Sequence, residues 1–118
     1  MPIGPVWELV IDCREPLPLA QFHASLIGGE AVDRDPDWAL VEPADDTGLR
    51  IGFQRVPESK QVKNRVHLDV LAPDLEAGTA AAVAIGARRQ GEVVREEDGA
   101  FQILLDPEGN EFCLVTGP

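Results

Sequence analysis

The sequence predicts an α+β fold in which two tandem βαβββ modules form a cupped, barrel-like mixed sheet with the helices outside. One segment with the alternating pattern of a strand is followed by a segment with a helical pattern and then by three more strand-like segments. This order occurs twice within 118 residues, and such a chain is long enough for one domain with its own core. Each half-sheet is too small to bury both faces, so we expect the two to curl around a cavity.

The first module covers about residues 5–57. Its first strand lies in VWELVIDC, where the alternation places Trp7 in the core. The segment LPLAQFHASLIGG predicts a helix that ends at Gly28–Gly29, with His23 partly exposed on it. A turn is expected at ADDTG, and the remaining strands are predicted at 30–35, 37–43 and 49–56.

A polar connector at about 57–63 leads to the second module at about 64–116. A strand is predicted over 64–72, and Asp74 is the expected N-cap of a helix that ends near Gly86. The DPEGN segment predicts a turn between the last two strands. The closing strands are predicted at 92–98, 100–106 and 111–115.

The strand at 64–72 has one apolar and one polar face. Its polar face carries Arg65, His67 and Asp69, because these residues alternate with aliphatic ones. Such a face either meets water or lines a polar cavity. His67 is one of only two histidines in the chain, so its environment decides what this face does.

Composition excludes several classes of function. Acidic residues outnumber basic ones 21 to 10, giving a net charge of −11, which argues against a nucleic-acid partner. The charge serves solubility or attracts a cationic ligand. No apolar run approaches the roughly 20 residues that span a bilayer, and no signal-peptide pattern opens the chain. Cys13 and Cys113 form no Cys-x-x-Cys motif, so we expect reduced thiols in a cytoplasmic protein.

This plan resembles the vicinal oxygen chelate superfamily, which includes glyoxalase I, bleomycin-resistance proteins and extradiol dioxygenases. The segments that carry the resemblance are REPLPLAQFHASLIGG, VPESKQVKNRVHLDV and the closing DPEGNEFCLV. The last two are especially similar to small glyoxalase-like proteins. The resemblance implies a homodimer and, in metal-using relatives, four ligands that project from four strands into the cup.

The resemblance also implies positions for those ligands. Glu8 and His67 each lie seven residues before the acidic residue that precedes a helix. Cys113 lies four residues after the turn glycine, at the position of the last ligand. The same count gives Gly52 in the first module, which offers no side chain, so Gln54 on the same face is the alternative. The predicted ligand set for a divalent ion is therefore Glu8, His67, Cys113 and Gln54.

Other residues are expected around the same cavity. Trp38 lines its mouth or packs in the core, and Arg65 either meets solvent or holds an anionic group of a substrate. The remaining candidates for the pocket are Asp69 and Glu111.

These residues leave several functions open. The first is an enzyme that binds a small oxygen-bearing molecule, as a metal-assisted lyase, isomerase or dioxygenase, or through acid–base work by Glu8 and His67 without a metal. A Cys113–His67 nucleophilic pair is a further chemical alternative. The second function is non-catalytic binding of a small molecule or antibiotic, as in bleomycin-resistance proteins. The third is a module that serves only as a subunit or regulatory domain.

Overall fold

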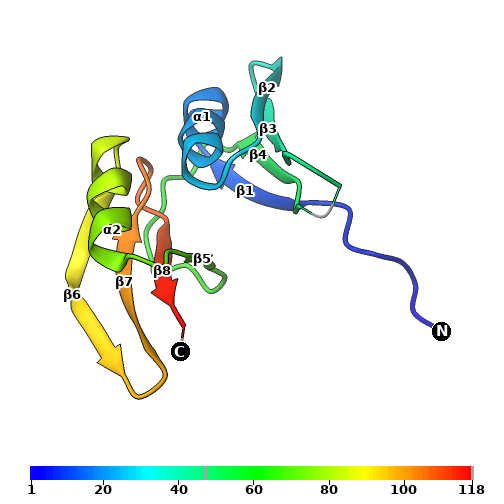
Figure 1. Ribbon diagram of the computed structural model, residues 1–118. Coiled ribbons are helices and arrows are strands. Elements are labelled where there is room, and N and C mark those ends of the chain that lie inside the picture. Colours follow the sequence, from blue (N-terminus) through cyan, green and yellow to red (C-terminus); the bar gives the residue numbers. More distant parts are fainter. Residues whose placement is uncertain (47, 118) are drawn as a thin grey trace. The chain divides into compact units, whose positions relative to one another are not determined.

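Each half of the chain folds into one four-stranded sheet with one helix packed on it, which confirms the predicted βαβββ order (Figure 1). The computed structural model describes residues 1–46 and 48–117. It divides the chain into two units, Met1–Ser59 and Lys60–Pro118. The turn expected at ADDTG includes Thr47, which lies outside the described residues.

The first unit has the sheet order β1-β4-β3-β2, with β1 and β4 parallel and the other neighbours antiparallel. Parallel pairing of the first and last strands requires a crossover, which the helix provides. The elements are β1 (Leu9–Cys13), α1 (Pro16–Ile27), β2 (Glu30–Asp35), β3 (Trp38–Glu42) and β4 (Ile51–Arg55).

Helix α1 covers one face of this sheet and contacts β2, β3 and β4. Leu19 and Phe22 of the helix are buried, as are Ile51 and Phe53 of β4, a strand that the helix contacts. The prediction that His23 is partly exposed is wrong, because its side chain is 2% exposed. Its ring lies 5.2 Å from the ring centroids of both Phe22 and Phe53, so the imidazole packs as part of the core.

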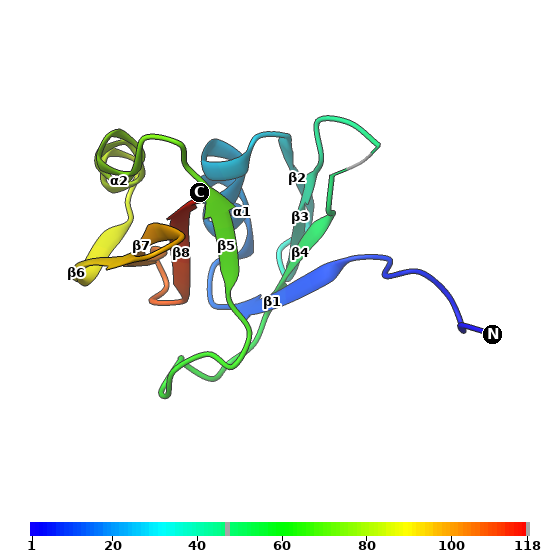
Figure 2. The same cartoon turned by 60° about the horizontal axis from the view of Figure 1, so that its bottom comes forward.

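The second unit repeats this topology with the order β5-β8-β7-β6, and β5 and β8 are parallel (Figure 2). Its first strand begins at Leu68, four residues later than predicted, so His67 lies immediately before it. The elements are β5 (Leu68–Leu71), α2 (Leu75–Ala84), β6 (Arg88–Glu96), β7 (Gly99–Leu105) and β8 (Glu111–Thr116).

Helix α2 packs against β6, β7 and β8 and approaches the sheet closely. The Asp74 cap is confirmed, since its carboxylate accepts a 3.0 Å hydrogen bond from the Ala77 N–H. A Cβ on Gly78 would lie 3.0 Å from the Ala72 Cβ, which explains a glycine inside this helix. Phe112 and Leu114 of β8 are buried at 2% exposure, on the strand that α2 contacts.

The alternation predicted Trp7 in the core, and this prediction is wrong. The strand begins at Leu9, and Trp7 is 76% exposed in the extended segment before it. The Arg50 guanidinium lies 5.4 Å from its ring centroid, within reach of a cation–π interaction. Among the described residues, no helix is long and apolar enough to cross a membrane.

Two adjacent glycines after α1 allow the cost of a positive φ to be measured separately from the cost of steric overlap by an added Cβ. Gly28 and Gly29 both have positive φ values, 90° and 94°. A Cβ at Gly28 meets nothing within 4 Å, whereas at Gly29 it would lie 2.3 Å from the Glu42 carbonyl oxygen. We expect Gly28→Ala to cost about 1–2 kcal/mol from its backbone conformation alone. Gly29→Ala should cost at least about 1 kcal/mol more, because overlap with backbone forces a shift. Urea denaturation measures both, and equal losses would contradict the close approach to Glu42.

Candidate functional site

The parallel pairing of β5 with β8 brings together side chains that are far apart in the sequence. Asp69 and Cys113 are direct partners in this register. His67 comes two residues before Asp69, and alternation places both on the same face of the strand. That face is opposite the one on which Phe112 and Leu114 are buried.

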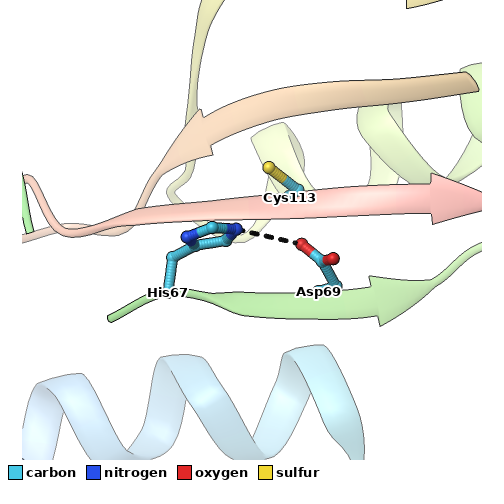
Figure 3. Close-up of side chains that lie close together, drawn as sticks. All are labelled: His67, Asp69 and Cys113. Atoms are coloured by element: carbon cyan, nitrogen blue, oxygen red, sulfur yellow. Dashed lines mark ion pairs between the residues drawn. The ribbon is translucent and has the colours of Figure 1, made fainter. Parts of the chain in front are cut away.

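The side chains of His67, Asp69 and Cys113 converge at this point (Figure 3). One ligand atom from each, an imidazole nitrogen, a carboxylate oxygen and the sulfur, all lie within 4.8 Å of one another. His67 Nε2 lies 3.3 Å from Asp69 Oδ1. The His67 and Asp69 side chains are 43% and 57% exposed, whereas Cys113 is only 9% exposed. Two accessible groups therefore lie beside a buried thiol.

The surroundings of Cys113 favour the protonated form of its thiol. Burial raises the pKa of Cys113, and the negative charge of Asp69 and a hydrogen bond to it raise the pKa further, while the charge of Lys63 opposes them. The thiolate is the form that acts both as a nucleophile and as a metal ligand, so a raised thiol pKa disfavours nucleophilic catalysis and means that a bound cation would have to displace the proton. His67 Nε2 lies 3.3 Å from the Asp69 carboxylate, and Cys113 is hydrogen-bonded to the same residue.

The three residues line an open groove of about 580 Å³ within the second unit. Phe101 and Val115 give this groove apolar lining. The hairpin that joins β6 to β7 adds three carboxylates, from Glu96, Glu97 and Asp98. The groove therefore combines an apolar surface with an excess of negative charge, a lining suited to a small organic molecule.

Glu111, which the sequence placed near the pocket, anchors the connector. Its carboxylate accepts hydrogen bonds from the Asn64 backbone N–H at 3.0 Å and from Lys60 Nζ at 3.1 Å. Its side chain is 9% exposed. Burial raises the pKa of the Glu111 carboxyl, but these hydrogen bonds and the charge of Lys60 outweigh burial and lower it. Glu111 thus holds the segment that leads directly to His67.

The DPEGN turn extends this anchor. The Asp106 carboxylate is 1% exposed and accepts hydrogen bonds from the backbone N–H groups of Glu108 and Asn110 and from the Asn110 amide. The Asn110 side-chain oxygen in turn accepts a 2.9 Å hydrogen bond from the Asn64 amide. The closing motif therefore fixes the end of the connector as well as its own turn.

The matching positions of the first unit look different. Glu8 precedes β1 as His67 precedes β5, and Gly52 pairs with Val10 as Cys113 pairs with Asp69. A Cβ on Gly52 would lie 3.0 Å from the Trp38 ring and 3.3 Å from Glu8 Oε2. The Trp38 indole therefore occupies the space where the second unit has a thiol.

Gln54 lies two residues after Gly52 on β4, and Arg65 lies two residues before His67. Gln54 pairs with Trp38 and is exposed, and both line an open groove of about 680 Å³ in the first unit. Arg65 is exposed in a bend before His67. Glu8 and Gln54 belong to the first unit, and His67 and Cys113 to the second. The four-residue ligand set therefore stays a prediction.

The comparisons with known proteins identify the family. The model of the glyoxalase-like domain family matches residues 8–115. The chain belongs to this family. This glyoxalase-like domain thereby confirms the predicted resemblance to the glyoxalase/bleomycin-resistance/dioxygenase, or vicinal oxygen chelate, superfamily. No curated protein matches the chain.

Solved structures share the fold of this glyoxalase-like domain at low identity. A glyoxalase/bleomycin resistance protein/dioxygenase family enzyme from Burkholderia phytofirmans is 19% identical, with a TM-score of 0.76 over 94% of this chain and 97% of that one. A glyoxalase-related enzyme from Fulvimarina pelagi is 15% identical, with a TM-score of 0.69 over 98% and 90%. A mutant of the fosfomycin resistance protein FosX from Listeria monocytogenes, complexed with Mn(II) and 1S,2S-dihydroxypropylphosphonic acid, is 17% identical, with a TM-score of 0.77 over 98% and 92%.

The donor atoms in the second unit of this glyoxalase-like domain fit a divalent metal ion. Imidazole nitrogen, carboxylate oxygen and thiolate sulfur are all ligands that proteins use for such ions. Asp69 was expected in the pocket but not among the ligands, and the acidic hairpin was not predicted. The acidic run REED before Gly99 was the sequence signal for the hairpin, whereas the pairing of Asp69 with Cys113 is seen only in the structure.

Loss of the Glu111 anchor should release the connector of this glyoxalase-like domain. Glu111→Ala removes the acceptor of the Asn64 N–H and leaves a partly buried Lys60 ammonium without its carboxylate. We expect a loss of about 1–3 kcal/mol in stability and faster hydrogen exchange at residues 60–66. Glu92→Ala, on the exposed strand β6, is the matched control and should change neither. Unchanged exchange in Glu111→Ala would rule out the anchor.

Proposed function

We propose that this glyoxalase-like protein binds a small oxygen-bearing organic molecule in the groove of its second unit, with a divalent metal ion held by His67, Asp69 and Cys113. The observation that carries the proposal is the convergence of three different ligand atoms within 4.8 Å on the wall of that groove. The FosX complex from the same superfamily contains Mn(II) and a small oxygen-rich ligand, which supports a metal at such a site.

The ion would supply a Lewis acid that polarises an oxygen atom of the bound molecule. Phe101 and Val115 would hold the apolar part of that molecule and exclude water from it. Glu96 and Glu97 would orient any positively charged group that it carries. The reaction class is that of a metal-assisted lyase, isomerase or dioxygenase.

The sequence-based hypothesis adds Glu8 and Gln54 to the functional residues. Glu8 is half-buried, with Oε2 3.3 Å from the position of a Cβ on Gly52. Acid–base work by Glu8 and His67 without a metal is the alternative form of this enzyme proposal. Variants at both positions therefore belong in its test.

We also propose a cytoplasmic homodimer without a nucleic-acid partner. Both cysteines are buried thiols, which suits a reducing compartment. The excess of acidic residues opposes binding to phosphate backbones. The homodimer follows from the resemblance to the superfamily.

Metal content of purified, untagged protein tests the enzyme proposal. We expect about one divalent ion per chain, because three protein ligands and an open position are typical of a catalytic site. An ion present at 100 times its dissociation constant should stabilise the fold by about 2.7 kcal/mol, and a chelator should remove that gain. Elemental mass spectrometry and thermal unfolding measure the two effects.

Variants locate the ion. His67→Ala and Asp69→Ala should both lose it, while Glu92→Ala retains it. Loss in Glu8→Ala as well would support the ligand set predicted from the sequence. Retention of the full metal content in His67→Ala and Asp69→Ala, or protein that never binds an ion, would exclude this site.

The acidic lining of the groove favours a second candidate function, the non-catalytic binding of a cationic compound. Asp69, Glu96, Glu97 and Asp98 all line the groove beside the apolar residues Phe101 and Val115. Four carboxylates around an apolar surface attract an organic cation with an apolar body. This function resembles that of drug-sequestering proteins and needs no metal.

Binding of charged dyes tests this second function. We expect the cationic dye thioflavin T to bind, and the anionic dye 8-anilinonaphthalene-1-sulfonate to bind more weakly. Because each exposed charge contributes about 0.5 kcal/mol, the double variant Glu96→Gln/Glu97→Gln should weaken thioflavin T binding about fivefold. Glu92→Gln makes the same substitution on β6 at a residue that does not line the groove, and it serves as the control. Fluorescence titration with no preference between the dyes would argue against a cation binder.

A further inference from the structure

We propose that the site in the second unit selects a thiophilic cation of the zinc class, with Cys113 as a thiolate ligand beside His67 and Asp69. This inference rests on the proposed function and concerns which ion the site takes. The proposed ion differs from that of the FosX complex, which contains Mn(II).

The chemistry of the three donors carries the selectivity. Thiolate sulfur is a soft donor that favours zinc and comparable ions, whereas manganese and magnesium prefer carboxylate, carbonyl and water oxygens. One nitrogen, one oxygen and one sulfur donor leave a fourth position of a tetrahedral zinc site for water or a ligand oxygen. The donors present therefore suit a four-coordinate ion with an open position better than an octahedral ion with oxygen ligands.

The position of Cys113 makes its sulfur the fixed member of the set. Cys113 lies in the middle of β8, paired with Asp69 on one side and with Ile103 on the other. The ladder on both sides fixes the face of the sheet on which the Cys113 side chain lies. The sulfur lies within 4.8 Å of the His67 and Asp69 ligand atoms, so an ion held by those two residues would lie beside it.

His67 and Asp69 have the freedom to complete the coordination. Their side chains are 43% and 57% exposed and extend from the edge strand and the residue before it. Exposed side chains change rotamer readily, so both can adjust to an ion near the buried sulfur. On binding, the S–H bond of Cys113 breaks, a sulfur–metal bond forms and the proton passes to solvent.

Metal competition on the full chain, freed of metal with a chelator, tests this inference. Almost any site with nitrogen, oxygen and sulfur ligands binds Zn²⁺ more tightly than Mn²⁺. The ratio of the two affinities in the wild-type protein is therefore not sufficient to show that the thiolate is a ligand. We expect Cys113→Ser to weaken Zn²⁺ binding by about tenfold or more and Mn²⁺ binding much less. Cys13→Ser replaces the other buried thiol, outside the cluster, and should leave both affinities unchanged.

Cobalt provides a readout that depends on the sulfur itself. Co²⁺ bound to a thiolate gives an intense near-ultraviolet sulfur-to-metal absorption, which should appear in the wild type and in Cys13→Ser but not in Cys113→Ser. The wild-type absorption needs no variant, so the test holds even if Cys113→Ser fails to fold. Co²⁺ that binds without this absorption, or Mn²⁺ that binds as tightly as Zn²⁺, would overturn the thiolate inference and leave the proposed metal site intact. No binding of any of the three ions would overturn both.

Discussion

The candidate site depends on the parallel pairing of β5 with β8. In this register Leu68 lies opposite Phe112, and Asp69 lies opposite Cys113. Phe112 is 2% exposed on the strand that α2 contacts, so a shift of one residue would expose it and turn the thiol toward the helix. Burial of apolar side chains on one face of β8 thus fixes the chemical groups on the other.

The same strand also determines how the chain enters the site. Its first residue, Glu111, binds the connector through Lys60 and Asn64, and Asn110 in the preceding turn binds Asn64 again. Because these contacts end three residues before His67, they restrict where that side chain can lie. One strand with its turn therefore supports the core, the connector and the candidate ligands together.

Local patterns predicted most of the fold but not the environment of single residues. The strand alternation and the Asp74 cap depend on neighbours in sequence, and the structure confirms both. The predicted start of β5 was wrong because Asn64 forms hydrogen bonds with the side chains of Glu111 and Asn110, which are 47 and 46 residues away in the sequence. A local pattern does not reveal such contacts. Trp7 and His23 were misplaced for a similar reason, since tertiary packing decides the exposure of a lone aromatic residue. Asp69 became a candidate ligand only through its pairing across β8.

The connector has a practical consequence for handling the protein. Lys60 and Lys63 are the only lysines in the chain, and Lys60 is held by Glu111. Reagents that acylate primary amines therefore react, apart from the amino terminus, only within the segment that leads to His67. Acylation of Lys60 removes the charge that Glu111 binds. Immobilisation through amines would thus alter the neighbourhood of the candidate site. A carboxyl-terminal tag would also follow shortly after Thr116, which lines the groove, so a tag at the amino terminus, in the first unit, is the better choice.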